Sequence, residues 1–512
     1  MWSQLFLRKP YQRFLEEMES DNRLRRVLGP VSLASLGIGS TIGAGIFVLV
    51  GLAAHDKAGP ALILSFVAAG VACVFAALCY AEFASMVPVA GSAYTYAYAT
   101  MGELFAWIIG WDLVLEYTVA SATVSHGWSH YFLNFLSIFK IHLPQYLTLA
   151  PYDYDKTGHV VASTYQYLGA AGQMMQGRYM MDLPALFISL VITVILVVGI
   201  RESAGFNTVM VILKLIIVLM VIGVGAFFIK TANWHPFAPF GYMGLSFFGK
   251  WVWGDVSAAG KPLGMLAGAA VVFFAYIGFD SVSTHAEEAK NPQRDVPIGI
   301  IVSLLLCTVL YILVAAVLTG MVPYGEINID APVAEAFKRV GLTWAQFLIG
   351  LGAVAGMTSV ILVLMLSQAR VLLAMARDGL LPQGFFGDVH PRFRTPWKGT
   401  IATGILVGIM GAFVPLRILA ELVNIGTLLA FVIVCIAVLI MRIRRPEQHR
   451  PFKAPLFPAV PILGAVTCLI LMFSLPSENW WRLLIWLVIG FVIYFSYGHR
   501  HSVLAKKLDP PA

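Results

Sequence analysis

The stretch Gly37-Ile-Gly-Ser-Thr-Ile-Gly-Ala-Gly-Ile-Phe47 decides the fold. It interrupts an apolar segment, residues 31–53, that is long enough to cross a bilayer, because a spanning helix needs about 20 largely apolar residues. Each glycine destabilises a helix interior by about 1 kcal/mol relative to alanine, so this density of glycine weakens the helix at mid-span. Backbone groups released there find no water, and such breaks survive only where they line a cavity or are buried in protein. The stretch therefore predicts either a binding cavity or close helix packing through small residues.

The composition of the whole chain is that of a membrane protein. Of its 512 residues, 59% are hydrophobic and 12% are charged, whereas a soluble domain carries about 25% charged residues. Too few charges remain to cover a water-exposed surface, so much of the surface must face the lipid bilayer. About twelve segments reach or approach spanning length, and they lie near 31–53, 60–87, 98–128, 183–200, 205–230, 264–285, 297–320, 344–373, 399–414, 418–441, 458–475 and 481–498.

The placement of the basic residues predicts the orientation. With the N-terminus inside, the expected cytoplasmic segments hold 21 Lys and Arg residues and the opposite side holds 11. This bias follows the positive-inside rule, so both termini are expected in the cytoplasm. The first 30 residues have no apolar core and do not read as a cleavable signal peptide. The net charge is +7, but the basic residues form no face interleaved with aromatics outside the predicted spans. We therefore expect no nucleic-acid partner.

A second interrupted segment, residues 264–285, carries Gly278, Asp280 and several hydroxyl side chains in its second half. The two interruptions fall in the first and sixth predicted spans, which is the placement expected of two inverted five-helix repeats. The predicted organisation is a cytoplasmic tail at 1–30, a first repeat at 31–230, an extracellular loop at 231–263, a second repeat at 264–441, two additional helices at 442–498 and a cytoplasmic tail at 499–512.

These interruptions also predict the chemistry of a site. The outer half of the first helix begins near residues 43–45, where free N–H groups and the positive end of the helix dipole favour a carboxylate. The inner half ends near residues 39–41, and the outer half of the sixth helix ends near residues 274–277. Both ends present free carbonyl groups, which suit an ammonium group. A carboxylate cradle beside an ammonium cradle predicts a receptor for an α-amino acid.

Several motifs carry a family resemblance. They are GIGSTIGAGIF (37–47), FFAYIGFDSVSTHAEE (273–288), EEAKNPQRDVPIGI (287–300), residues 79–117 and ARDGLLP (376–382). Together they resemble the amino acid–polyamine–organocation superfamily, and more closely the bacterial members of its cationic amino acid transporter branch. The resemblance implies an all-α, LeuT-like fold of five plus five helices with two further helices. It also implies alternating access around a midplane site, in the cytoplasmic membrane of a bacterium.

Matching motif by motif, the resemblance implies individual site residues. The substrate carboxylate would meet the N–H groups of Gly43, Ala44 and Gly45. The aromatic ring of Phe274 would close over the substrate on the outer side. The amino group would meet carbonyl groups at or near Thr41, Phe274, Ala275 and Ile277.

Among the charged residues inside predicted spans, two are candidates for proton coupling. Lys214 sits in an otherwise apolar fifth span, where a lysine costs about 3 kcal/mol on insertion scales, so it should face the bundle interior. Snorkelling to the interface is the alternative. We expect Lys214 to carry a proton, because sodium-coupled relatives of the fold bind a cation near this position. Glu116, in the third span, is expected to relay protons, to serve as a counter-ion or to hydrogen-bond a broken helix.

The expected side-chain preference rests on Met357, which falls where the eighth helix of relatives approaches the substrate side chain. A bulky Met there leaves little room for lysine or arginine, or it merely packs between helices. We therefore predict proton symport of small neutral amino acids such as alanine, with cationic substrates or exchange as alternatives. A membrane enzyme would need a nucleophile with a base, an arrangement that the sequence does not present. A nutrient sensor built on this fold would be expected to carry longer cytoplasmic extensions than the two predicted tails. Apart from the proton we expect no cofactor and no metal; the five cysteines form no metal-binding pattern.

Overall fold

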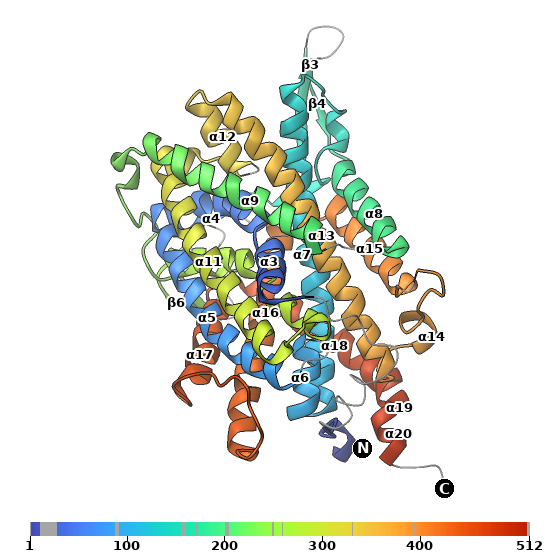
Figure 1. Cartoon of the computed structure of the whole chain (residues 1–512). Helices are drawn as coiled ribbons and strands as arrows, with labels where there is room; N and C mark the ends of the chain where they lie inside the picture. Colours follow the sequence, from blue (N-terminus) through green and yellow to red (C-terminus); the bar gives the residue numbers. More distant parts are fainter. Residues whose placement is uncertain are drawn as a thin grey trace.

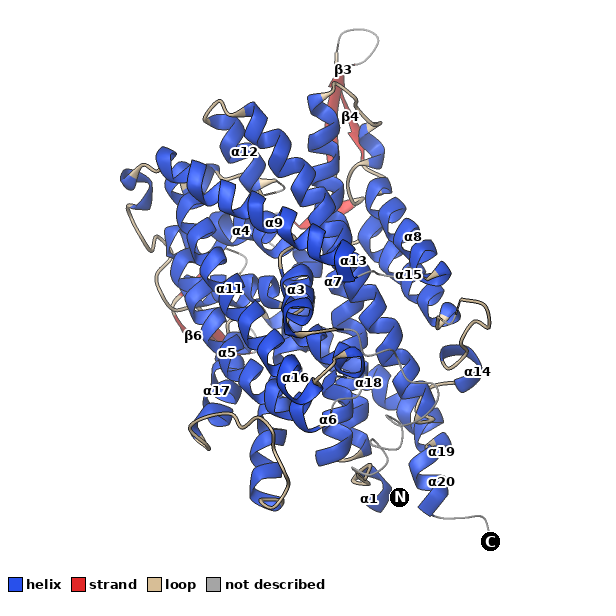
Figure 2. Cartoon of the chain, viewed as in Figure 1, coloured by secondary structure: helices blue, strands red, loops and turns tan. Residues whose placement is uncertain are grey.

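The computed structural model describes residues 2–10, 28–87, 92–154, 160–168, 173–199, 204–247, 250–258, 260–329, 331–393 and 395–508. Residues 11–27 of the predicted N-terminal tail lie outside the described residues. Helices make up the body of the molecule, and the strands form short hairpins at its periphery (Figure 2). The protein is thus an all-α membrane protein, as predicted.

The apolar helices form one bundle (Figure 1). Among the described residues, eight helices are long and apolar enough to cross a membrane, and three shorter apolar helices accompany them. The number twelve for the spans stays a prediction. The elements of the bundle are α3 (Pro30–Thr41), η1 (Gly45–Leu49), α4 (Val50–Ala53), α5 (Leu62–Met86), α7 (Glu103–Ile138), α8 (Leu183–Val198), α9 (Ala204–Gly225), α10 (Met265–Val272), η7 (Phe273–Tyr276), η8 (Asp280–Glu288), α11 (Pro292–Met321), α13 (Thr343–Arg377), α15 (Trp397–Phe413), α16 (Leu416–Arg444), α17 (Ala459–Phe473) and α18 (Ser477–Ile493).

Shorter elements join the bundle helices. The hairpins β1–β2, β3–β4, β5–β6 and β7–β8 are antiparallel pairs. The remaining elements are α1 (Trp2–Leu5), η2 (Ala54–Ala58), η3 (Gly59–Ala61), α6 (Ser92–Thr100), η4 (Gln145–Leu147), β1 (Tyr152–Tyr154), β2 (Val160–Ala162), β3 (Thr164–Leu168), β4 (Met174–Arg178), η5 (Ala226–Phe228), η6 (Thr231–Trp234), β5 (Leu245–Phe247), β6 (Lys250–Trp253), β7 (Asp255–Val256), β8 (Pro262–Leu263), η9 (Tyr324–Glu326), α12 (Pro332–Arg339), α14 (Gln383–Phe386), η10 (Tyr494–Gly498), α19 (His499–His501) and α20 (Val503–Leu508).

The two ends of the described chain lie at one end of the bundle, while the β3–β4 hairpin lies at the other (Figure 1). Gln4 of α1 donates a hydrogen bond to the carbonyl of His499, 2.7 Å away, which ties the two ends together. The third predicted span differs from the structure, because α6 and α7 are separate helices. Gly102 divides them with φ +115°, and a Cβ there would lie 2.7 Å from the backbone of Phe6.

Elements that correspond in the two predicted five-helix repeats pack against one another. The start of the second half of the first helix, η1, contacts η7 of the sixth, and α5 contacts α11. In the same way α7 packs on α13, and α8 packs on α15. The additional helix α17 lies against α16 and α5. This mutual packing is what two inverted repeats produce, and it brings both interrupted helices to the centre.

Candidate functional site

The first helix is interrupted at the predicted stretch. Helix α3 ends at Thr41, and Ile42 then adopts an extended conformation with ψ 100°. The second half of this helix starts where the carbonyl of Gly43 accepts hydrogen bonds from the N–H groups of Ile46 and Phe47, at 3.3 and 3.2 Å. The N–H groups that open a helix have no partner within it. Those of the first turn are therefore available to an anion.

The sixth helix is interrupted directly beside the first. Its turn η7 ends at Tyr276, and the next residue, Ile277, is extended with ψ 130°. Gly278 follows with φ +120°, a conformation that favours glycine. The carboxylate of Asp280 accepts from the Gly278 N–H at 3.2 Å and from the Tyr117 hydroxyl at 3.0 Å. Asp280 thus satisfies backbone that the interruption has released.

Hydrogen bonds and close packing hold the two interruptions together. The Ser40 hydroxyl lies 2.8 Å from the Gly278 carbonyl oxygen, and the Ser281 hydroxyl donates to Ser40 across 3.2 Å. A Cβ on Gly45 would lie 2.3 Å from the Cα of Ala275, so the two backbones touch. Only glycine permits this approach at residue 45.

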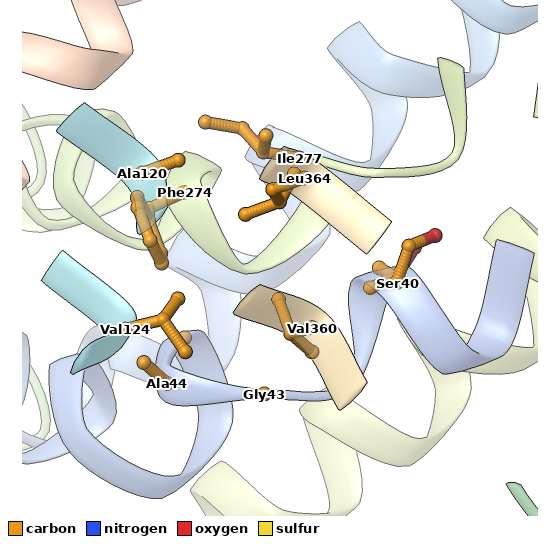
Figure 3. A pocket seen from close by; sticks show the side chains of 11 residues that line it. Ser40, Gly43, Ala44, Ala120, Val124, Phe274, Ile277, Val360 and Leu364 are labelled. Atoms are coloured by element: carbon orange, nitrogen blue, oxygen red, sulfur yellow. The ribbon is translucent and has the colours of Figure 1, made fainter. Parts of the chain in front are cut away.

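A small cavity lies where the interruptions meet (Figure 3). The backbone around residues 40–45 forms one wall. The other walls are apolar side chains from helix α7, helix α13 and the interruption of the sixth helix. The lining residues are Ser40, Thr41, Gly43, Ala44, Gly45, Ala120, Val124, Phe274, Ile277, Val360 and Leu364.

Most of the predicted substrate-site residues come together here. Six of the eight line the cavity; Ala275 and Met357 do not. Ala275 packs its backbone on Gly45 instead. The fully buried Met357 lies beside Gly127 of α7, where an added Cβ would be 3.4 Å from its sulfur. The α13 residues that reach the cavity, Val360 and Leu364, follow Met357 by about one and two helical turns.

The sequence did not reveal the aliphatic lining. Ala120 and Val124 are four residues apart on α7, and Val360 and Leu364 have the same spacing on α13. This spacing places each pair on one helix face. The same pattern occurs wherever a helix packs against a neighbour, so it carries no sign of a binding site.

Two of the carbonyl groups that are predicted to bind the substrate's ammonium group each accept one hydrogen bond from the protein. The Thr41 carbonyl accepts from the Tyr311 hydroxyl at 2.8 Å. The Phe274 carbonyl accepts from the Ile277 N–H at 3.1 Å. A carbonyl oxygen has two lone pairs, so each keeps one further acceptor position.

Lys214 points from α9 into the bundle. Its side chain is 1% exposed, and Nζ donates a hydrogen bond to the Gly39 carbonyl, 2.6 Å away. This carbonyl belongs to the last turn of α3. The aliphatic part lies along α13, where a Cβ on Gly356 would be 3.2 Å from Lys214 Cε. The side chain faces the interior, and it connects α9 to the interrupted helix rather than snorkelling.

Glu116 is also buried, with 1% of its side chain exposed. Among the described residues its Oε1 has no hydrogen-bond partner. The charged groups that interact with it are Asp280, at the sixth-helix interruption, and Asp112, one turn earlier on α7. Glu116 therefore lies within electrostatic range of the carboxylate that supports the sixth helix, and it does not line the cavity.

One connection closes the bundle at the end that carries α1 and α20. The N–H of Leu28, just before α3, donates to the carbonyl of Glu288 at the end of η8, 2.9 Å away. The Glu288 carboxylate in turn pairs with Arg370 of α13 at 2.8 Å. The ends of both interrupted helices and α13 are thus held together on this side.

This geometry agrees with comparisons to known proteins. The family model described as amino acid permease matches residues 28–494. The chain belongs to this family. Two proteins of Bacillus subtilis are similar to the permease over 98% of its length and all of theirs: the methylthioribose transporter, 44% identical, and the branched-chain amino acid permease BcaP, 46% identical. The vacuolar cationic amino acid transporter 4 of Arabidopsis thaliana is 38% identical over 84% of this chain and 65% of its own.

The family settles the general class of the protein. The permease is a transporter and not an enzyme, as predicted, and it is a member of the amino acid–polyamine–organocation superfamily. Amino acids are the substrates that membership implies. Its many apolar helices and its Bacillus relatives place it in a membrane as a multi-pass protein.

Proposed function

We propose that the permease carries small neutral L-amino acids such as alanine into the cell together with protons. Alternating access to the cavity between the two interrupted helices would provide the route. The observation that carries this proposal is the composition of the cavity: backbone N–H and carbonyl groups on one side, aliphatic and aromatic side chains on the other.

The backbone side of the cavity suits the groups that all α-amino acids share. N–H groups at residues 43–45 would bind the carboxylate, with the positive end of the helix dipole adding to the attraction. The spare lone pairs of the Thr41 and Phe274 carbonyls would accept from the ammonium group. Phe274, which is 5% exposed, lines the cavity and would cover the substrate.

The apolar side of the cavity favours a small neutral side chain. Its lining residues carry no ionised side chain. A buried charge without a partner costs several kcal/mol, so a lysine or arginine substrate would be penalised here. The cavity is also small, which favours alanine over bulkier neutral residues. Met357 does not take part in this selection in the structure, and Val360 takes its place.

Lys214 supports protons as the coupling ion. Its amine is held in the bundle interior by the Gly39 carbonyl, at the inner edge of the first-helix interruption. Gain or loss of a proton on this amine changes its charge beside the substrate-binding backbone. Glu116, buried near the other interruption, would relay protons.

Uptake into proteoliposomes tests this function. Labelled alanine is expected to accumulate when an inward proton gradient is imposed in sodium-free buffer. The unlabelled competitors are valine, leucine, lysine, arginine and methylthioribose, because the names of the relatives give different substrates. Equal uptake without the gradient, or accumulation only into vesicles preloaded with substrate, would contradict symport. Stronger competition by arginine than by unlabelled alanine would contradict the neutral substrate.

Shortening Val360 is expected to change the substrate preference. Its Cγ2 lies 2.8 Å from where a Cβ on Gly43 would be, so its methyl groups stand over the carboxylate-binding backbone. Val360→Ala removes two methyl groups from the cavity wall. One methylene more or less in a hydrophobic pocket changes the discrimination between substrates by about 1–3 kcal/mol, or tenfold and more. The ratio of valine to alanine uptake should rise about tenfold. Val302→Ala, at a position on α11 with 46% exposure, should leave the ratio unchanged; an unchanged ratio in Val360→Ala would remove this residue from the substrate site.

A further inference from the structure

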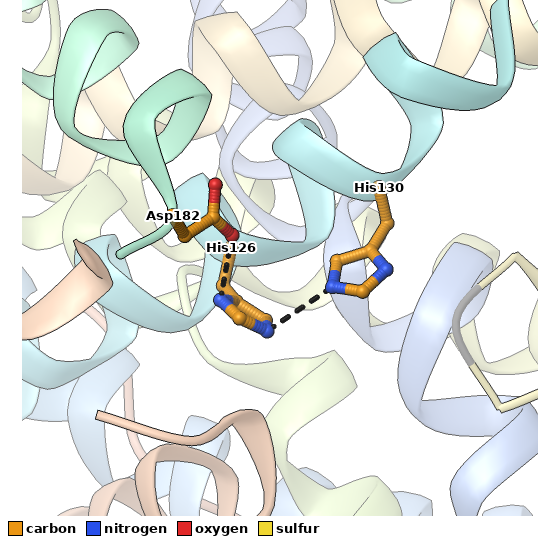
Figure 4. Close-up of side chains that lie close together, drawn as sticks. All are labelled: His126, His130 and Asp182. Carbon is orange, nitrogen blue, oxygen red and sulfur yellow. Dashed lines mark hydrogen bonds and ion pairs between the residues drawn. The ribbon is translucent and has the colours of Figure 1, made fainter. Parts of the chain in front are cut away.

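A histidine pair lies on α7, close to an aspartate that precedes α8 (Figure 4). His126 and His130 are four residues apart, so both project from the same face of the helix. Asp182, which directly precedes α8, approaches His126 from the neighbouring helix. The three side chains offer ligand atoms that all lie within 4.8 Å of one another. None of them lines the substrate cavity.

The distance between the two imidazoles fits a shared metal ion. Their Nε2 atoms lie 3.1 Å apart and point at each other, as Figure 4 shows. Zinc binds histidine nitrogen at about 2.0–2.1 Å, so two nitrogens on one tetrahedral ion are about 3.3 Å apart. A small side-chain rotation would admit the ion. Two histidines at this spacing on one helix face are a recurrent zinc-binding arrangement.

Asp182 lies within ion-pair distance of the first imidazole, close enough to orient it when Nδ1 carries a proton. Its Oδ2 lies 3.0 Å from His126 Nδ1, and both groups are at most 3% exposed. With the proton on Nδ1, the Nε2 lone pair of His126 faces His130. Carboxylate–histidine–metal triads are built in this way. The other oxygen, Oδ1, accepts from the Ser129 hydroxyl at 2.5 Å and from the Ala185 N–H at 3.1 Å, which fixes the carboxylate.

Space for further ligands lies next to the pair. An open cavity is lined by His126, by the β1 residues Tyr152 and Asp153, and by Arg417. Half of the tetrahedral positions of an ion held by two histidines would remain for water. His130 is partly exposed, so an ion can arrive from the solvent.

We propose that His126 and His130 bind a late first-row divalent cation such as Zn²⁺ through their Nε2 atoms, with Asp182 orienting His126 from outside the first shell of ligands. Imidazole is a preferred ligand of this class of metal. Without the ion, one imidazole donates a hydrogen bond to the other, which is the arrangement in the structure. This site is separate from the substrate cavity and does not depend on the proposed function.

Zinc titration of the purified permease in lipid nanodiscs tests the proposal. After chelator treatment and its removal, calorimetry with Zn²⁺ should show one saturable site. His130→Ala should abolish this site, and Asp182→Asn should weaken it about 10- to 100-fold, as expected for loss of the group that orients a ligand. His142→Ala is the control, because His142 is exposed in the loop beyond α7 and lies outside the cluster, so binding should not change.

Two results would overturn the proposal. The first is a zinc isotherm for His130→Ala that matches that of the unmodified protein. The second, which needs no variant, is the absence of saturable, zinc-displaceable Co²⁺ absorption in the unmodified permease. Alanine uptake by His130→Ala should stay within about twofold of normal in chelator, since the pair does not line the substrate cavity. A loss of zinc binding with intact uptake therefore separates this site from the transport function.

Discussion

Replacement of Lys214 by alanine is expected to abolish proton-driven accumulation of alanine. Lys214 Nζ is the hydrogen-bond donor that α9 presents to the Gly39 carbonyl. Without the amine, the proton that Lys214 is proposed to take up and release has no carrier at this position. Alanine uptake under an imposed proton gradient should fall to the level of passive equilibration. A coupling free energy between proton and substrate of about 1.4 kcal/mol or larger corresponds to a loss of tenfold or more.

The same variant should keep its substrate site. Exchange of labelled for unlabelled alanine across the membrane needs no net proton movement, so exchange should persist where gradient-driven uptake is lost. Lys214→Ala leaves a void and deprives a buried carbonyl of its donor, and the lost hydrogen bond costs about 1–3 kcal/mol. Lys214→Met therefore serves as a second variant, because its side chain fills the volume. Lys338→Ala is the matched control, since that ammonium is half exposed and pairs with Glu335 on α12. Unchanged gradient-driven accumulation in both Lys214 variants would remove this residue from the mechanism.

Substitution of Gly45 by alanine is expected to stop transport altogether. The added Cβ would lie 2.3 Å from the Cα and 2.5 Å from the Cβ of Ala275. Backbone atoms cannot rotate away, so the two interrupted helices must separate by roughly 1 Å. Such overpacking costs about 1–3 kcal/mol and displaces the carboxylate-binding N–H groups. Uptake and exchange should both fall to background, and the thermal unfolding temperature should drop.

A second glycine provides the comparison. A Cβ on Gly223 of α9 would meet nothing within 4 Å, so Gly223→Ala tests alanine in a spanning helix without a clash. This variant should transport normally and unfold at the usual temperature or slightly above it, because alanine is the better helix former. Normal exchange by Gly45→Ala would show that contact between the first and sixth helices is not needed for binding.

The sequence was sufficient for the interruptions because their residues have few other uses. The glycines around residue 43 and Gly278 at φ +120° serve positions that other residues fill poorly. It was also sufficient for the interior position of Lys214, since a lysine in an apolar span has only two outcomes, the bundle interior or the interface. The structure shows the interior.

The sequence was not sufficient for the cavity walls or for the helix ends. Val124 and Val360 look like any packed aliphatic residues until α7 and α13 are placed around the interruptions. Met357 was expected at the wall, but residues about one and two turns later on the same face of α13 line the cavity instead. The division of α6 from α7 depends on contact between Gly102 and Phe6, residues far apart in the chain.

The mutual packing of equivalent helices has an energetic consequence. If each half of the molecule supplies the same kind of contacts, then exchanging the roles of the halves replaces one set of contacts by a nearly equal one. The two arrangements then differ little in free energy, and neither acts as a deep trap. Moving such an equilibrium from 1:99 to 99:1 takes about 5.5 kcal/mol of differential binding. The smaller the difference between the two arrangements, the less differential binding is needed, so a near-symmetric scaffold is one that a small ligand can drive.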